Sequence, residues 1–379
     1  MDYEDKYQEL EQYLRAGEPD VAERARNWSM AIGLQDVDGL KPSQFLLDQA
    51  KENIEGRISS AEVGKRLEEY YKQKDIRQEA EANGTFEADT VSERINMLLA
   101  EKAFTFSPAE LTRIHGFLFR GVLSHAGRFR DYRITKNQWI LDGETIEYGS
   151  PTSLTSLLTF DFSEEKKYDY GQHNAVDAIT HIARFIADVW QVHAFGEGNT
   201  RTTAVFLIKY LRNFGFNVNN ESFAKHSWFF RNALVRAHYE NIPKGIHRTF
   251  EPLERFMNFA VFGIPADLRN RTLHIRWKEV NSASDNNRPD SVSPKSATDE
   301  ISKGKICTLN CTLEEAAVLK CITDNPKMTQ KAIAEAIGKS ERTVKSITSS
   351  LVEKGIILRQ NGRRNGWWEI LKECHHGES

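Results

Sequence analysis

The chain has 379 residues, 40% of them hydrophobic and 28% charged, and its formal net charge is -3. This length predicts two or three domains because one hydrophobic core rarely serves more than about 250–300 residues, and the near-neutral charge excludes a chain that is basic throughout and binds nucleic acid along its whole length. No apolar run reaches about 18 residues and the first residues are acidic, so we expect no membrane-spanning helix and no signal peptide.

The N-terminal region, residues 1–75, is predicted to be helical. Apolar residues recur at helical spacing from Phe45 to Ile54, Gly56 ends this segment, and Ser59 is the expected N-cap of the next helix. The stretch 72–90 that follows is polar and contains Asn83-Gly84, so we expect an exposed connection there.

The central region, residues 91–265, also has mainly helical patterning. Apolar side chains recur every three to four residues over 175–192 and again over 202–213. Between residues 129 and 148, aromatic and β-branched residues lie on both sides of Asp142-Gly143, which predicts a short β-hairpin.

A polar segment, residues 281–305, predicts a flexible linker before a separate unit at 312–371. In this unit two short helices meet at a turn over 336–339, and two short strands follow with a basic turn between them. The order resembles a winged helix-turn-helix domain. The unit has ten Lys and Arg residues against seven Asp and Glu, which favours a polyanionic partner.

The resemblance implies that the second helix lies in the major groove of DNA. It would present Arg342, Thr343, Lys345, Ser346 and Ser349 to the bases, while Arg363 and Arg364 of the basic turn would meet phosphates. Many winged helices bind proteins instead, so both kinds of partner stay open. The four cysteines lie in the last fifth of the chain, which excludes a disulfide-built extracellular scaffold and predicts a cytoplasmic protein.

The segment from His193 to Arg201 combines several groups that can bind a ligand or take part in a reaction. A helix ends in a histidine, which can accept a proton near neutral pH. Gly196 and Gly198 let backbone amides approach a ligand, and the next helix begins near Thr200, so its positive end points into the same loop. Arg201 adds a donor pair for phosphate oxygens.

Glu197 in the same loop can hold a hard cation such as Mg²⁺ together with substrate phosphates. Each of these residues alone has an ordinary explanation, since a histidine often ends a helix and a Glu-Arg pair four residues apart is often a surface ion pair. All of them within nine residues indicate a nucleotide-dependent transfer site.

This segment resembles the signature loop of Fic-domain proteins, His-Pro-Phe-x-(Asp/Glu)-Gly-Asn-Gly-Arg-x-x-Arg. The flanks resemble the family too, because residues 127–148 look like its flap and residues 233–239 like the helix that borders the nucleotide base. The resemblance implies a mainly α fold, in which a helical Fic core with a β-hairpin flap precedes the small winged-helix domain.

The family resemblance implies protein AMPylation, in which AMP from ATP is transferred with Mg²⁺ to a Tyr, Thr or Ser hydroxyl of a target protein. His193 would be the base and Glu197 would hold the metal. The loop residues expected at the nucleotide are Gly196, Gly198, Asn199, Thr200 and Arg201. Leu141, Asp142, Gly143 and Glu144 of the flap would clamp the target and cover the nucleotide, and Phe230, His238 and Tyr239 would lie near the adenine.

Three positions depart from the signature. Ala194 replaces proline, Thr200 replaces the second glycine, and Ala204 replaces the second arginine, which commonly meets the γ-phosphate. The identity of the donor nucleotide therefore stays open.

A second resemblance concerns the N-terminal region, which looks like the antitoxin-type module fused to some Fic proteins. Its inhibitory pattern, (Ser/Thr)-x-x-x-Glu-(Gly/Asn), is matched by Glu55 and Gly56 but not by Lys51. The resemblance implies that Glu55 enters the active site and inhibits it by binding Arg201 or the loop amides, so that Glu55→Gly raises AMPylation.

Two other functions remain open at this point. One is a DNA-binding regulator whose Fic core has lost catalysis, which Thr200 and Ala204 favour. The other is a hydrolase that removes AMP from a target. Whether the chain forms a homo-oligomer is likewise open.

Overall fold

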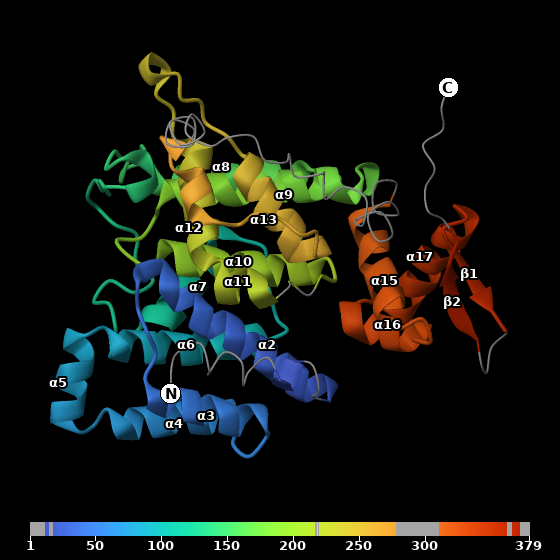
Figure 1. Ribbon diagram of the computed structural model, residues 1–379, viewed down its shortest axis with the longest axis horizontal. Coiled ribbons are helices and arrows are strands. Elements are labelled where there is room, and N and C mark those ends of the chain that lie inside the picture. Colours follow the sequence, from blue (N-terminus) through green and yellow to red (C-terminus); the bar gives the residue numbers. More distant parts are fainter. Residues whose placement is uncertain are drawn as a thin grey trace, which may run out of the picture.

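Helices form nearly all of the regular structure in the computed structural model, which describes residues 12–14, 18–216, 218, 220–277, 311–361 and 366–371. Figure 1 shows a helical body and, beside it, a smaller unit that holds both described strands. The mainly α fold predicted from the sequence is therefore confirmed. No helix in the described part of the chain is long and apolar enough to cross a membrane.

Between residues 18 and 82 the structure describes four helices and one 3-10 turn. They are α2 (Pro19–Gly33), η1 (Leu34–Asp38), α3 (Gln44–Ile54), α4 (Ser60–Tyr70) and α5 (Lys74–Ala82). The side chains of Ser43 and Ser59 cap α3 and α4 by accepting hydrogen bonds from backbone amides of their first turns, so the predicted start of α4 is confirmed.

The stretch 72–90 is largely exposed up to residue 83, as predicted, but it is helical and not an irregular connection. This stretch contains α5 and the start of α6 (Thr85–Ala100), separated by Gly84 with a φ of 79°. Ala80 is buried, and the guanidinium of Arg77 lies 4.4 Å from the ring centroid of Phe86. A few such contacts hold a helix whose other faces are polar, which composition alone does not reveal.

The central body is built around two long helices, α9 (Ala175–Val192) and α10 (Asn199–Asn213). Helix α10 is buried along nearly its whole length, and α9 packs against α8, α10, α12 and α13. The surrounding elements are α7 (Pro108–Phe119), η2 (Trp139–Leu141), α8 (Leu154–Lys167), η3 (Tyr170–Gln172), α11 (Asn220–Lys225), α12 (Ser227–His238), η4 (Ile242–Lys244), α13 (Glu251–Phe262) and η5 (Asn270–Leu273).

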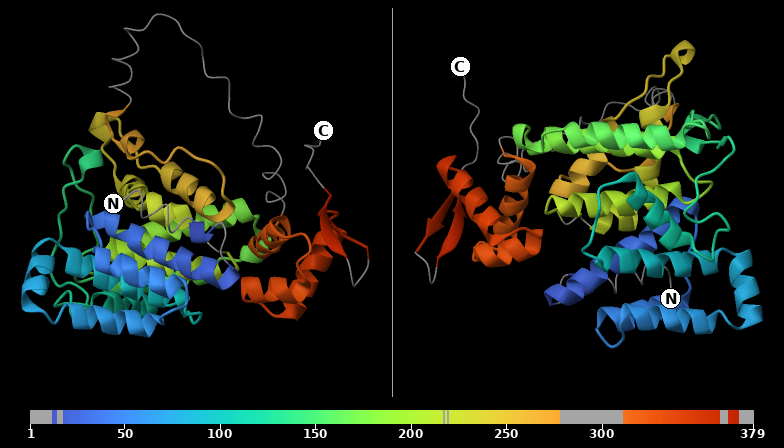
Figure 2. Two further views of the ribbon diagram at one scale, coloured as in Figure 1. Left: turned by 60° about the horizontal axis from the view of Figure 1, so that its bottom comes forward. Right: turned by 180° about the vertical axis from the view of Figure 1, so that it is seen from behind.

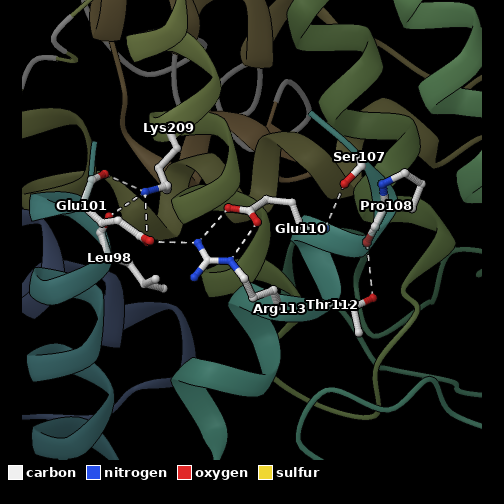
Figure 3. A network of polar contacts seen from close by, with 8 residues as sticks. All are labelled: Leu98, Glu101, Ser107, Pro108, Glu110, Thr112, Arg113 and Lys209. Carbon is white, nitrogen blue, oxygen red and sulfur yellow. Dashed lines mark hydrogen bonds and ion pairs between the residues drawn. The ribbon is translucent and has the colours of Figure 1, made fainter. Parts of the chain in front are cut away.

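A buried lysine fixes α10 against α6 and α7. The ammonium of Lys209 donates to the carbonyl oxygens of Leu98 and Glu101, each at 2.8 Å, and Arg113 joins Glu101 to Glu110 (Figure 3). Because these carbonyls end α6, the contacts set the position of α6 along α10.

Helix α2 crosses α11 so closely that only a glycine fits at the crossing. A Cβ at Gly33 would lie 2.4 Å from the Cα of Ala224, and the hydroxyl of Ser227 donates to the Gly33 carbonyl at 2.8 Å. The turn η1, which follows Gly33 directly, is thereby placed against α12 and α10.

The predicted β-hairpin over residues 129–148 is not a pair of strands. Residues 133–138 and 142–148 run without regular structure, and the tip is the turn η2, closed by hydrogen bonds between Gln138 and residues 141–144. Ile140 and Leu141 are fully buried. Burial of the tip in the body holds this flap, so a ladder of paired strands is not needed to fix it.

The C-terminal unit contains α15 (Leu313–Asp324), α16 (Gln330–Ile337), α17 (Glu341–Glu353), β1 (Ile357–Gln360) and β2 (Trp367–Ile370). The strands are antiparallel, with Ile357 opposite Ile370, as the winged-helix resemblance predicts. The unit contacts the body through the Cys311 carbonyl, which accepts from the Ala175 amide, and through Lys320, which donates to the Val261 carbonyl. Figure 2 shows this unit beside the body from two further sides. The predicted linker at 281–305 and the basic residues Arg363 and Arg364 lie outside the described residues.

Candidate active site

The loop between α9 and α10 is held in shape by its own polar side chains. His193 ends α9 in a left-handed conformation with a φ of 49°. Asn199 closes the loop because its side chain accepts from the Phe195 amide at 3.0 Å and donates to the Phe195 carbonyl at 2.7 Å. The loop predicted from the sequence is therefore a rigid turn, and Asn199 is a structural residue of it.

His193 is placed to act as a base. Its side chain is 3% exposed, Nδ1 lies 3.3 Å from the Trp190 carbonyl, and Nε2 has no hydrogen-bond partner among the described residues. Burial, and then the nearby charge of Lys136, lower the pKa of His193 well below its usual value. The imidazole is neutral at pH 7, with the Nε2 lone pair available when Nδ1 carries the proton.

Thr200 has a role in the fold that explains the departure from glycine. Its hydroxyl accepts a hydrogen bond from the indole of Trp190 at 3.0 Å, and both groups are buried. The threonine side chain thus binds α9. Ala204, one turn further along α10, is fully buried.

The first turn of α10 is buried, with Asn199, Thr200 and Arg201 each at most 8% exposed. Gly198 precedes it with a φ of 71°, and no described side chain caps the helix. A Cβ at Gly198 would lie 2.3 Å from the ring of Phe119, so glycine is required there. His115 holds the loop through two contacts. Its Nε2 lies 3.1 Å from the Glu197 carbonyl, and its ring stacks on Phe195.

Arg201 is 2% exposed and is bound by three side chains of η1 and α6. It donates to Gln35 Oε1 at 3.0 Å and to Glu87 Oε1 at 2.5 Å. Its Nε lies 2.9 Å from Asp38 Oδ2, but the N–H does not point at the carboxylate, so this contact is an ion pair without a hydrogen bond. The guanidinium also lies 4.8 Å from the ring centroid of Phe119.

Glu55 is not among the partners of Arg201. It follows the last turn of α3, where it accepts a hydrogen bond from Tyr13 and pairs with Arg57. The expectation that Glu55 reaches the loop is not met in this structure. The N-terminal region does contact the predicted site, but through η1 and α6.

The flap residues expected at the ligand are divided between the core and the surface. Leu141 is fully buried and Asp142 pairs with Arg276, whereas Gly143 is exposed. Glu144 accepts from Tyr239 at 2.5 Å and pairs with Lys244, which together lower the pKa of its carboxyl. Leu141 therefore anchors the flap rather than contacting a ligand.

The residues expected near an adenine are already in contact with protein. Phe230 is fully buried, with the ring centroids of Phe223 and Phe256 at 5.2 and 5.1 Å, so it is a core residue. His238 Nε2 lies 2.9 Å from the Ala187 carbonyl, and burial lowers the pKa of His238 to about 4. Of this set, Tyr239 alone contacts the flap, through Glu144.

Three basic residues near His193 were not anticipated. Arg130 donates to the His193 carbonyl at 2.8 Å and to the Tyr132 carbonyl, which ties the loop to the flap. Lys136 of the flap and Arg231 of α12 lie close enough to His193 for their charges to lower its pKa. Each lies far from the loop in sequence, so local spacing carries no signal for it.

The described residues contain no group of three or more His, Cys, Asp or Glu side chains that could hold a metal ion. Glu197 is an exposed carboxylate at the loop and has the hard oxygen donors that Mg²⁺ prefers. A cation bound there would need its other ligands from water and from substrate oxygens.

The comparisons agree with the two sequence resemblances. Residues 105–211 match the Fic/DOC family, and residues 316–357 match a winged helix-turn-helix DNA-binding family. A Fic family protein from Desulfovibrio desulfuricans G20 is 14% identical, with 99% of this chain and 95% of that chain covered and a TM-score of 0.40. No curated protein matches the chain. The chain therefore contains a Fic domain at residues 105–211 and a winged helix-turn-helix at residues 316–357.

Proposed function

We propose that the chain is a protein adenylyltransferase, which transfers AMP from ATP to a hydroxyl group of a target protein. The observation that carries this proposal is the Nε2 atom of His193, which is buried, neutral and without a hydrogen-bond partner among the described residues, in the loop that leads to the uncapped first turn of α10. A base beside an anion site suits phosphoryl-type transfer, in which positioning and charge neutralisation provide most of the catalysis.

In the proposed reaction His193 Nε2 removes the proton of the target hydroxyl. The hydroxyl oxygen attacks the α-phosphorus of ATP, the bond from that phosphorus to the β-phosphate oxygen breaks, and pyrophosphate leaves. Amides of the first turn of α10 and the Arg201 guanidinium bind the phosphates. Glu197 would hold Mg²⁺, which when bound neutralises phosphate charge.

The target segment enters along the flap. A cavity of about 380 Å³ is lined by residues 133–135 and 145–150, and includes Tyr148. The ring centroid of Tyr148 lies 4.3 Å from that of His193. In this proposal the backbone along this cavity, which forms no strand, pairs with an extended peptide of the target and so brings a hydroxyl side chain toward the base.

The N-terminal helices inhibit the reaction in this proposal. Gln35, Asp38 and Glu87 occupy the Arg201 guanidinium, so a nucleotide must displace them to use that cation. In this proposal the inhibitory contacts lie on η1 and α6 instead of at Glu55.

Incubation of the full chain and a cell lysate with ATP labelled at the α-phosphate tests the proposal. We expect label on protein with the wild type and none with His193→Ala. Label at the γ-phosphate should not be transferred. If wild type and the Asp38→Ala variant both fail to label any protein, the catalytically inactive regulator is favoured. If they release AMP from labelled protein, the hydrolase is favoured.

We also propose DNA as a partner of the winged helix. On α17, Arg342, Lys345, Ser346 and Ser349 are exposed on one face, while Val344, Ile347 and Leu351 are buried on the other. Its N-terminus is capped by Ser340, and the matched family is described as DNA-binding. An exposed basic and hydroxylic face is the arrangement that a recognition helix requires.

A further inference from the structure

The signature loop supplies one cation for the phosphates. That cation is Arg201, and Ala204 offers no charge one turn further along α10. A nucleoside triphosphate carries several negative charges, so a site for it needs further cations. Those cations must come from parts of the chain outside the loop.

Arg231 of α12 is a half-buried cation whose direct contacts are all neutral. Its guanidinium donates to Gln138 Oε1 at 2.7 Å and to Asn232 Oδ1 at 3.1 Å, and no described carboxylate forms an ion pair with it. No negatively charged group among the described residues therefore contacts the Arg231 guanidinium. Gln138 in turn joins this guanidinium to the surroundings of the base, because its amide donates to the Tyr148 hydroxyl at 3.2 Å and the Tyr148 ring centroid lies 4.3 Å from that of His193.

Lys136 is a second cation of this kind. Its backbone amide is held by Thr145 at 3.3 Å in the flap, and its half-buried ammonium has no hydrogen-bond or ion-pair partner among the described residues. Burial lowers the pKa of Lys136, and the carboxylates of Asp38 and Glu197 lie near enough to oppose that shift. A buried ammonium without a bound anion is costly unless a ligand supplies one.

Asp38 connects these cations. Its carboxylate lies 2.9 Å from Arg201 Nε, and its charge also acts on Lys136 and Arg231. The side chain of Asp38 is 45% exposed, so it can move into solvent when another anion takes its place.

We propose that Lys136 and Arg231 bind the phosphate tail of the nucleotide together with Arg201, and that Asp38 lies among them in place of a phosphate. This inference rests on the proposed function and adds the residues that select a triphosphate. Arg231 and the flap residue Lys136 are both hydrogen-bonded to Gln138, through its side-chain oxygen and its amide respectively, so in this proposal the two cations interact with a phosphate chain and much less with a nucleoside monophosphate.

Calorimetric titration of the full chain with ATP, ADP and AMP in the presence of MgCl₂ tests this inference. We expect Lys136→Met and Arg231→Met each to weaken ATP binding about 10-fold or more and AMP binding less than about 3-fold. Arg231→Lys should recover part of the loss, since it restores the charge. Arg236→Met, which removes another half-buried arginine from α12, is the matched control and should leave the ratio of ATP to AMP affinity unchanged.

Equal weakening of ATP and AMP in the Arg231→Met and Lys136→Met variants, or no weakening of either, overturns this inference. AMP transfer by the wild type would still support the proposed function in that case. If neither the wild type nor Asp38→Ala binds any of the three nucleotides, both proposals fail.

Discussion

Replacing Glu87 with glutamine should lower the stability of the protein without nucleotide and raise its affinity for ATP. Glu87 contacts Arg201 at 2.5 Å, with the carboxylate 24% exposed and the guanidinium 2% exposed. A hydrogen bond to a charged group of this kind contributes about 1.5–3 kcal/mol. The substitution keeps the shape and one acceptor oxygen, so we expect a loss of about 1–2 kcal/mol in the free energy of unfolding.

The effect on ATP has the opposite sign. A nucleotide that takes Arg201 must first break the Glu87 contact, so weakening that contact by about 1.4 kcal/mol raises ATP affinity about 10-fold. Asp38→Ala should raise it by about 1.4- to 5-fold, because that carboxylate is 45% exposed and an exposed ion pair contributes about 0.2–1 kcal/mol. The two effects share Arg201 and need not add.

Urea unfolding without nucleotide and calorimetric titration with ATP and MgCl₂ measure the two halves of this prediction. Glu55→Gln is the matched control, since Glu55 is a carboxylate of the same region that contacts Tyr13 and Arg57 instead. We expect ATP affinity within about 2-fold of wild type for it. A Glu87→Gln protein that is less stable but binds ATP no better would refute competition between Glu87 and nucleotide.

Other consequences are open to equally direct tests. A base must be neutral, so AMP transfer should be present above the pKa of His193 and lost as the pH falls through it. Because burial lowers that pKa, a pH–rate profile should show its acid limb below about pH 6.5. An acid limb above pH 6.5 would contradict the assignment of His193 as the base. Thr200→Val should cost about 1–3 kcal/mol in urea unfolding because the buried Trp190 indole loses its acceptor, whereas Thr155→Val on an exposed face should change stability by less than about 0.5 kcal/mol. Lys345→Ala should lower the slope of log affinity against log salt for duplex DNA by about 1, and salt-independent binding by the wild type would exclude a phosphate contact.

Local sequence patterns predicted correctly those parts of the structure that a short segment determines by itself. Helix α9 is an amphipathic segment with an Asn174 cap, and α17, capped by Ser340, begins directly after the predicted turn over 336–339. The loop from His193 to Arg201 was found because its groups lie within nine residues, and a turn of that length brings them together whatever surrounds it. Caps, periodicity and tight turns are properties of short segments, so a single sequence contains them.

The partners of Arg201 could not be found in the same way. Gln35 is 166 residues away in sequence and Glu87 is 114 residues away, and the polar stretch around Glu87 predicted a connection. Glu55 matched an inhibitory pattern, but a pattern does not state which face of the bundle a helix end will contact. The crossing of α2 over α11 at Gly33 places η1, and not the end of α3, at the loop, and this crossing depends on tertiary packing alone.

The burial of Arg201 links the local structure of the loop to the tertiary contacts of η1 and α6. A guanidinium that is 2% exposed is stable only with anionic or hydrogen-bonding partners, whether these are the side chains of η1 and α6 or the phosphates of a ligand. Both sets of partners need the same donor atoms, so they exclude each other. Any change that moves η1 away from α10 must therefore either bring a phosphate to Arg201 or lower the stability of the fold. In the proposed function, the occupancy of the nucleotide site and the docking of the N-terminal helices form one equilibrium.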